Sequence, residues 1–270
     1  MRHNYQLTDH PVGSMREIWA VSWPLMLSLS STSLMTFADR LYLTHFSLAA
    51  MNAVACASAF CFVLIAFPLT ICEITGVFVG RLHGKNESDQ IGKPVWQMIW
   101  LVLLSWPLFM LMSRFVSPFL FAPESDEALY FVTSLDFGPF QLASFALMGF
   151  FLGTGKTKTI TLSTVLANLL NLILAPLFIF GTAITPALGV KGAALATGIS
   201  LGFQAFFLLF LLLQKKHRQR YHTYPCGIKP SLIKEMLTLA VPAGIGRTAE
   251  SVAHSLFFRI IAMAGAIELT

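Results

Sequence analysis

The sequence predicts an all-α, polytopic membrane protein with seven transmembrane helices, and three observations support this fold class. Hydrophobic residues make up 56% of the chain and charged residues 11%, well below the roughly 25% typical of soluble domains. Seven nearly uncharged stretches are each longer than the ~20 residues needed to cross a ~30 Å hydrocarbon layer. They lack the strict two-residue alternation of a membrane barrel, so helices are the remaining way to pair their backbone groups in lipid.

Charged residues mark the limits of the apolar stretches along the chain. The stretches occupy residues 17–39, 46–80, 95–121, 128–152, 159–181, 189–214 and 236–266. Arg81 follows the second, Lys93 precedes the third, Lys158 precedes the fifth and Lys215 follows the sixth. We therefore expect seven separate helices, with one long connection that begins at Lys215.

The distribution of lysine and arginine predicts the orientation of these helices. Thirteen of the 18 basic residues lie in four segments on the side of the N-terminus: 1–16, 81–93, 156–158 and 215–234. The connections on the other side hold Arg40, Arg114 and Lys191. Because cytoplasmic loops are enriched in lysine and arginine, we expect a cytoplasmic N-terminus and an outward-facing C-terminal end. The net charge of +5 then favours contact with anionic membrane lipid, and we expect no nucleic-acid partner.

An internal repeat divides the chain. Arg16 and Glu17 precede the first apolar helix and its Pro24, and Lys234 and Glu235 precede the last helix and its proline in the same way. We expect a six-helix lobe over 1–214, a basic cytoplasmic linker over 215–230, which we interpret as a hinge, and the first helix of a second lobe over 231–270. Internal repeats of this kind are typical of secondary transporters.

Several short motifs, in order and spacing, give the chain its family resemblance. They are Trp23-Pro24, Thr36-Phe-Ala-Asp39, Val79-Gly-Arg81-Leu-His-Gly84, Gly138-Pro139, Gly153-Thr-Gly155-Lys-Thr157-Lys158, Leu177-Phe-Ile-Phe-Gly181 and the segment Pro186–Thr197. In these motifs the chain resembles the multidrug and toxic compound extrusion (MATE) transporters. One departure is Arg81, where the family usually has glutamine.

The resemblance implies a twelve-helix, two-lobed antiporter in which a sodium or proton gradient drives export of cationic small molecules by alternating access. It implies a multi-pass protein of the plasma membrane, or of the inner membrane if the source is bacterial. This chain would supply the first lobe and the seventh helix. We expect it to be truncated, with the missing second lobe in the same chain or in a second subunit.

Glu250 is the leading candidate for the coupling or substrate site. An ionisable side chain inside a membrane helix costs at least a few kcal/mol, which makes each one a functional hypothesis. The resemblance assigns cation binding to a glutamate at this spacing from Pro242. The alternative is an ion pair with Arg247 or His254 on the same helix face.

A second candidate cation site lies in the first lobe. The resemblance places Asp39, Asn171 and Thr197 there, with Asn168 on the same helix face as Asn171. Where many relatives have aspartate or asparagine, this chain has Ala175, so the site would have one ligand fewer. The alternatives are a helix-end ion pair for Asp39, which Arg40 follows, and simple interhelical hydrogen bonds for the asparagines.

Two further acidic residues are weaker candidates for a transport pathway. Glu73 lies inside the second apolar stretch, where it could also reach the cytoplasmic surface, and Asp136 lies toward the outer end of the fourth. The three glycine pairs Gly76/Gly80, Gly149/Gly153 and Gly198/Gly202 predict close helix contacts, within the bundle or between copies.

The sequence gives little support to other functions. We find no metal-ligand pair, nucleophile elbow or clustered acid and base, and we expect no enzyme activity, metal or cofactor apart from the coupling ion. The four cysteines are expected to be free thiols. Two alternatives stay open: a flippase of lipid-linked saccharides, for which Arg247 and Arg259 are mild support, and a membrane subunit without transport activity.

Overall fold

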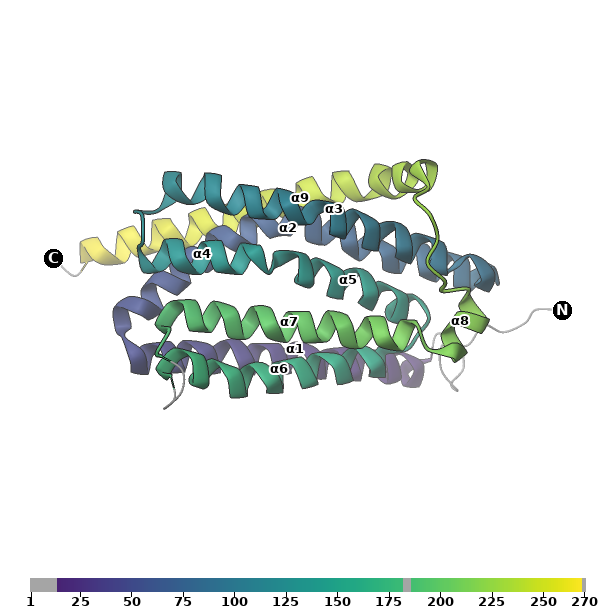
Figure 1. The fold of residues 1–270 in the computed structure, drawn as a ribbon, viewed down its shortest axis with the longest axis horizontal. Helices are drawn as coiled ribbons and strands as arrows, with labels where there is room; N and C mark the ends of the chain where they lie inside the picture. The colour runs from purple at the N-terminus through teal and green to yellow at the C-terminus, as the bar shows by residue number, and fades with distance from the viewer. Residues whose placement is uncertain (1–13, 182–185, 269–270) are drawn as a thin grey trace.

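A computed structural model describes residues 14–181 and 186–268, and helices dominate this part of the chain (Figure 1). In chain order they are α1 (Met15–Phe46), α2 (Leu48–Gly84), the 3-10 turn η1 (Ser88–Gln90), α3 (Gly92–Leu120), α4 (Asp126–Asp136), α5 (Gly138–Gly153), α6 (Thr157–Phe180), α7 (Gly189–Leu212), α8 (Lys215–Tyr221) and α9 (Pro230–Glu268). The long helices run side by side along the molecule, with the described N- and C-terminal ends at opposite ends of the bundle.

The described helices include four that are long and apolar enough to span a membrane, namely α2, the η1–α3 segment, α6 and α7. The bent pair α4–α5 qualifies as a fifth span when taken as one. α1 and α9 contain 32 and 39 residues and so exceed the length needed, but they carry more polar side chains. The serines and threonines of α1 reach α6, as described below.

The fourth apolar stretch is not the single helix that its hydropathy predicts. It divides into α4 and α5, which are bent by 41° at Phe137. Gly138 and Pro139 open α5, and a proline has no backbone N–H to continue the hydrogen bonds of the preceding helix. The break places the aromatic side chains of Phe137 and Phe140 against α7, where they meet Gly198 and Gly202.

Serine caps fix where three of the helices begin. The Ser14 hydroxyl accepts a hydrogen bond from the Glu17 N–H (3.2 Å) at the start of α1, and Ser125 accepts one from the Ala128 N–H (3.2 Å) at the start of α4. Ser47 separates α1 from α2: its N–H donates to the Leu43 carbonyl, and its hydroxyl accepts from the Ala50 N–H. These bonds satisfy backbone groups that a helix end leaves unpaired.

Glycines bring α2 and α5 into close contact. A Cβ atom built on Gly149 would lie 2.7 Å from the Gly76 backbone nitrogen, and one on Gly153 would lie 2.7 Å from that of Gly80. Two of the predicted glycine pairs therefore face each other within the bundle, which answers the question left open by the sequence. Backbones approach this closely only where side chains are absent.

The described parts of the segments predicted to be cytoplasmic gather at one end of the bundle (Figure 1). There the short helix α8 packs its Tyr221 ring against Phe150, at a centroid distance of 5.4 Å. The following connection lies against α3: Gln97 donates to the Gly227 carbonyl (3.1 Å) and accepts from the Lys229 N–H (2.6 Å). The side chains of α3 thus hold the segment that the sequence suggests as a hinge.

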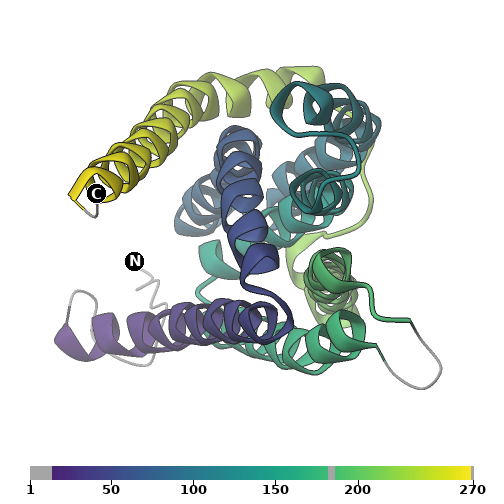
Figure 2. The same ribbon diagram turned by 90° about the vertical axis from the view of Figure 1, so that its left-hand side faces the viewer.

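The end-on view shows α1 and α9 on two different sides of the bundle, with α2 running between them (Figure 2). α1 packs chiefly against α6, whereas α9 packs chiefly against α2 and also contacts α3. At the α2–α9 crossing, a Cβ atom on Gly244 would lie 2.9 Å from the Phe67 ring. α2 therefore provides the main packing surface for α9.

Candidate functional site

A line of polar side chains joins α1 to α6 inside the apolar bundle. Thr161 of α6 donates to the Pro24 carbonyl (2.6 Å) and accepts from the Ser28 hydroxyl (3.1 Å). About two turns further along α6, the Asn168 amide donates to the Ser31 hydroxyl (2.9 Å). A buried polar group destabilises the fold unless it is hydrogen-bonded, and each of these polar side chains is hydrogen-bonded to a partner on the other helix.

Asp39, Asn171 and Thr197 meet at the far end of this line, where α1, α6 and α7 come together. The Asn171 side chain is fully buried and lies between the other two residues. With its amide nitrogen directed at Asp39, the distance to the Asp39 Oδ1 is 2.9 Å, and its oxygen is 3.1 Å from the Thr197 Oγ1. The half-buried Asp39 carboxylate keeps oxygen atoms available for a further partner.

The structure thus brings together three of the predicted site residues, which come from three different helices. Asn168 belongs to the same α1–α6 seam but contacts Ser31 and Thr32 rather than Asp39. Ala175, at the position where the resemblance leads us to expect a further polar ligand, is fully buried among apolar side chains. The cluster therefore contains one carboxylate, one amide and one hydroxyl.

A small cavity adjoins this cluster. Its volume is about 160 Å³, and it lies between α2, α4, α5 and α7 with Thr197 in its wall. Its polar lining includes Tyr130, Ser134 and Gln141. The rest of its lining is mostly apolar and includes Phe62, Ile65 and Leu201.

Glu250 lies on an exposed part of α9, eight residues after Pro242. Arg247, which the sequence offered as its ion-pair partner, instead contacts Glu73 of α2, with 3.8 Å between its Nη2 and the Glu73 Oε1. Both side chains of that pair are partly exposed, at 44% and 37%. The pair joins α2 to α9.

Asp136 has a structural contact that the sequence did not predict. Its carboxylate accepts two hydrogen bonds from the Arg114 guanidinium, at 2.7 and 3.0 Å, and a third from the Ser113 hydroxyl. This two-pronged geometry is the strong form of an arginine–carboxylate pair. It ties the end of α4 to α3.

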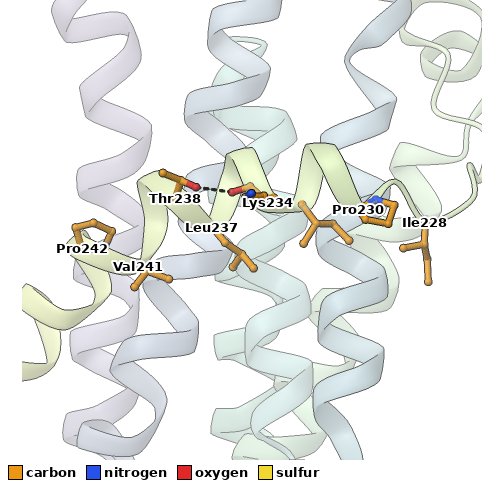
Figure 3. Close-up of a pocket in the computed structure, with 8 residues that line it drawn as sticks. Ile228, Pro230, Lys234, Leu237, Thr238, Val241 and Pro242 are labelled. Carbon is orange, nitrogen blue, oxygen red and sulfur yellow. Dashed lines mark hydrogen bonds between the residues drawn. The ribbon is translucent and has the colours of Figure 1, made fainter.

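An apolar depression of about 570 Å³ lies along the first turns of α9 (Figure 3). Ile228, Leu237 and Val241 point to one side of the helix, and the Thr238 hydroxyl donates to the Lys234 carbonyl (2.8 Å). The charged side chain in its lining is the basic Lys234, which repels cations. This depression is a surface for apolar contacts and not a cation site.

Sequence reasoning missed the hydroxyl groups that surround the asparagines. Ser28 and Ser31 lie three residues apart on α1 and contact α6, and Gln204 of α7 donates to Thr164 (3.0 Å). Polar residues at helical spacing within an apolar stretch were the available signal. Among the side chains that the structure describes, no group of three or more histidine, cysteine or acidic residues is arranged to hold a metal ion.

A bundle of membrane-length helices with a carboxylate and polar partners between them defines a multi-pass membrane protein built like a transporter lobe. The MatE family profile matches residues 24–177, more than half of the 270 residues, and the chain belongs to this family of membrane transporters. The family expected from the motifs is confirmed.

Named relatives and solved structures agree with this assignment. The chain is 26% identical over 240 residues to the probable multidrug resistance protein NorM of Bacillus cereus, covering 85% of this chain and 53% of the relative. It is 28% identical over 208 residues to the probable multidrug resistance protein YoeA of Bacillus subtilis, covering 72% and 45%. The chain thus spans about half the length of these relatives.

The fold also matches a solved transporter. A structure described as the outward-facing conformation of a multidrug resistance MATE family transporter of the MOP superfamily aligns with a TM-score of 0.77. The sequences are 22% identical, and the match covers 88% of this chain and 53% of the other. The all-helical membrane fold predicted from the sequence is confirmed.

Proposed function

We propose that this chain forms half of a cation-coupled antiporter that exports organic cations from the cytoplasm. The observation that carries this proposal is the Asp39–Asn171–Thr197 cluster. It offers a carboxylate to a cation at a point where three helices meet. The relatives named as multidrug resistance proteins support a drug-like substrate.

In the proposed cycle, Asp39 alternates between a cation-bound state and a state bonded to Asn171. A sodium ion prefers several oxygen ligands, and the Asp39 carboxylate, the Asn171 carbonyl oxygen and the Thr197 hydroxyl can supply them. A proton would instead neutralise the carboxylate and change the hydrogen bond to the Asn171 amide. Either event alters the contacts between α1, α6 and α7, and this change is how binding would move the first lobe.

Glu250 is proposed as the second anionic site, facing the space between two lobes. Its exposure on α9 suits a residue that a substrate or a second lobe must reach. A single carboxylate cannot neutralise two cations at once, so competition between coupling ion and organic cation for Glu250 would produce exchange. Glu73, paired with Arg247, would respond to any movement of α9 along α2.

The missing half is proposed to be a second lobe, in the same polypeptide or in another subunit. The chain spans about half the length of its curated relatives, and the apolar face of α9 shown in Figure 3 suits packing against further membrane helices. We propose the plasma membrane as the location, with the basic end of the bundle in the cytoplasm.

A lipid-linked saccharide flippase is less well supported. Such a substrate carries phosphates and calls for unpaired basic groups, but Arg247 contacts the Glu73 carboxylate. The side chain of Arg259 lies outside the described residues.

The test is ethidium efflux from cells that express the intact reading frame, comparing wild type with Glu250→Gln and Asp39→Asn. Sodium and proton gradients are collapsed in turn. We expect efflux to stop when one gradient is removed and to fall at least tenfold in Glu250→Gln. The proposal would be overturned if, at equal expression, efflux is unaffected by collapse of either gradient and by either substitution.

A further inference from the structure

A separate cavity opens at the end of the bundle that the charge distribution places outside the cell. Its volume is about 700 Å³, within the ~300–1,000 Å³ range of small-molecule pockets. It lies where α2, the α3–α4 connection and α9 meet, and its walls include Cys56, Phe60, Phe121, Glu127 and Val252. It shares no lining residue with the Asp39 cluster.

Aromatic rings form one wall of this cavity. Phe60 of α2 and Phe121 at the end of α3 lie edge to face, with centroids 5.6 Å apart and an interplanar angle of 85°. Phe121 in turn packs against the fully buried Phe131, at 5.5 Å, so its ring is held in place. The faces of such rings attract organic cations by roughly 0.5 to 2 kcal/mol each when the cation is close.

The charge in the cavity wall is negative. Among the described lining residues the charged side chain is Glu127, which is half-buried in the first turn of α4. Glu124 and Asp126 precede it in the sequence and add negative charge to the same segment. A single carboxylate beside apolar and aromatic walls suits a bulky monovalent organic cation, whereas a divalent metal ion would require more oxygen ligands.

We propose that this cavity binds hydrophobic monovalent organic cations, with Glu127 supplying the charge and Phe60 and Phe121 supplying aromatic contacts. The inference rests on the proposed export of organic cations. It adds a binding site on the outer side of the first repeat, distinct from Asp39 and Glu250.

The first test is equilibrium dialysis of labelled tetraphenylphosphonium against the purified chain in detergent. Glu127→Gln should weaken binding about fivefold, and Phe60→Leu or Phe121→Leu about threefold because each keeps the apolar volume but removes a ring face. Glu124→Gln removes a charge from the same segment outside the lining and should change binding less than twofold. The proposal would be overturned if Glu127→Gln binds tetraphenylphosphonium as tightly as wild type does and both proteins elute at the same position in size-exclusion chromatography.

Tetraphenylborate, which has nearly the same shape and the opposite charge, separates charge from apolar fit. It should bind more weakly than tetraphenylphosphonium to wild type, and Glu127→Gln should strengthen its binding. If Glu127→Gln changes the binding of neither ion, the site is not charge-selective.

The exposed Cys56 thiol in the cavity wall locates the bound cation. Saturating tetraphenylphosphonium should slow alkylation of Cys56 by N-ethylmaleimide at least threefold. Alkylation of Cys226, near the other end of the bundle, is the internal reference and should not change. Equal slowing at both thiols, or none at Cys56, would overturn the assignment.

These results are separable from those of the efflux test. Protection of Cys56 without gradient-driven efflux would leave the binding site and remove the transport proposal. Coupled efflux that depends on Glu250, without protection of Cys56, would support the transport proposal and remove the binding site in this cavity.

Discussion

The Lys156 ammonium nitrogen lies 2.6 Å from the His217 Nε2, where the α5–α6 connection meets α8. The other ring nitrogen, Nδ1, lies 2.7 Å from the Leu211 carbonyl oxygen and so donates its proton there. Nε2 is then the acceptor for Lys156, which requires a neutral imidazole. Phe150, Phe151 and Tyr221 surround the ring.

This contact predicts that acid destabilises the cytoplasmic end of the bundle. Burial lowers the pKa of His217 below its ordinary 6.5, and Lys156 and Lys216 lower it further, although the bond to Leu211 opposes them. The folded state therefore binds fewer protons at His217 than the unfolded state does. Its contribution to stability is complete above about pH 6.5 and is lost as the pH falls below that value.

Thermal unfolding of the purified chain at pH 7.5 and 5.5 measures this effect. His217→Gln keeps a hydrogen-bond acceptor but does not titrate. Between pH 7.5 and 5.5, its melting temperature should therefore fall by about 2–4 °C less than the melting temperature of wild type does. His45→Gln, at an exposed position in α1, serves as the control. Identical pH dependence in wild type and His217→Gln would remove His217 from the explanation.

Lys156 adds a second pH dependence at the same place. Burial, together with Arg220 and Lys216, lowers its pKa from 10.5 to about 8. Between about pH 8 and 10.5 the unfolded chain binds more protons at Lys156 than the folded chain does. The contribution of Lys156 to the stability of the fold therefore rises with pH over this range. Lys156→Met should reduce this rise, as measured by melting temperatures at pH 7.5 and 9.5.

The main features of the fold follow from the sequence. The lengths of the apolar stretches predict the membrane helices, and the lysines and arginines in the connections predict which connections lie at the same end of the bundle. The break at Phe137 does not follow, since a glycine and a proline inside an apolar run are tolerated in membrane helices that stay continuous. The Glu73–Arg247 pair also escaped prediction, because it depends on how α9 crosses α2. Sequence spacing alone favoured contacts within one helix.

The glycine contact between α2 and α5 predicts a strong difference between otherwise similar substitutions. Gly149→Ala and Gly153→Ala would each place a methyl group 2.7 Å from a backbone nitrogen of α2, so the helices must separate. We expect each to lose about 1–3 kcal/mol of stability, seen as a lower melting temperature. Gly246→Ala in α9 meets no described atom within 4 Å and should be neutral or stabilising. Equal effects at positions 149 and 246 would contradict the close contact.

The connection between α8 and α9 is predicted to depend on Gln97 of α3. Its amide bonds the Gly227 carbonyl and the Lys229 N–H, so Gln97→Leu leaves two backbone groups without these partners. Hydrogen exchange in a peptide covering 224–229 should become about fivefold to tenfold faster, as expected for the loss of about 1 kcal/mol. Gln90→Leu removes a side-chain contact to Lys93 and should leave this peptide unchanged. The indole N–H groups of Trp96 and Trp100 also donate to this segment, to the Thr223 carbonyl (3.2 Å) and the Cys226 carbonyl (2.9 Å) respectively. No change in Gln97→Leu would mean that these two bonds hold the segment without Gln97.

The Asp39 cluster makes the last prediction, because its middle residue has a different role from its acidic one. Asn171 is fully buried between Asp39 and Thr197, so Asn171→Ala leaves a half-buried carboxylate without its amide and should cost about 1–3 kcal/mol. Asp39→Asn keeps an oxygen that can accept from Asn171 and should cost less. If Asp39 binds the coupling cation, that cation stabilises wild type, by about 2.7 kcal/mol at a hundred times its dissociation constant.

Melting curves in sodium chloride and in choline chloride, at two pH values, distinguish the two proposed ions. A sodium-dependent rise that is present in wild type and absent in Asp39→Asn identifies sodium as the ligand of this cluster. A rise on acidification that Asp39→Asn abolishes identifies a proton, since the acid destabilisation caused by His217 is the same in both proteins. Asn168→Ala, which alters the same α1–α6 seam at Ser31, should keep whichever response wild type shows. If Asp39→Asn responds to both conditions as wild type does, Asp39 is a structural residue and coupling must depend on Glu250.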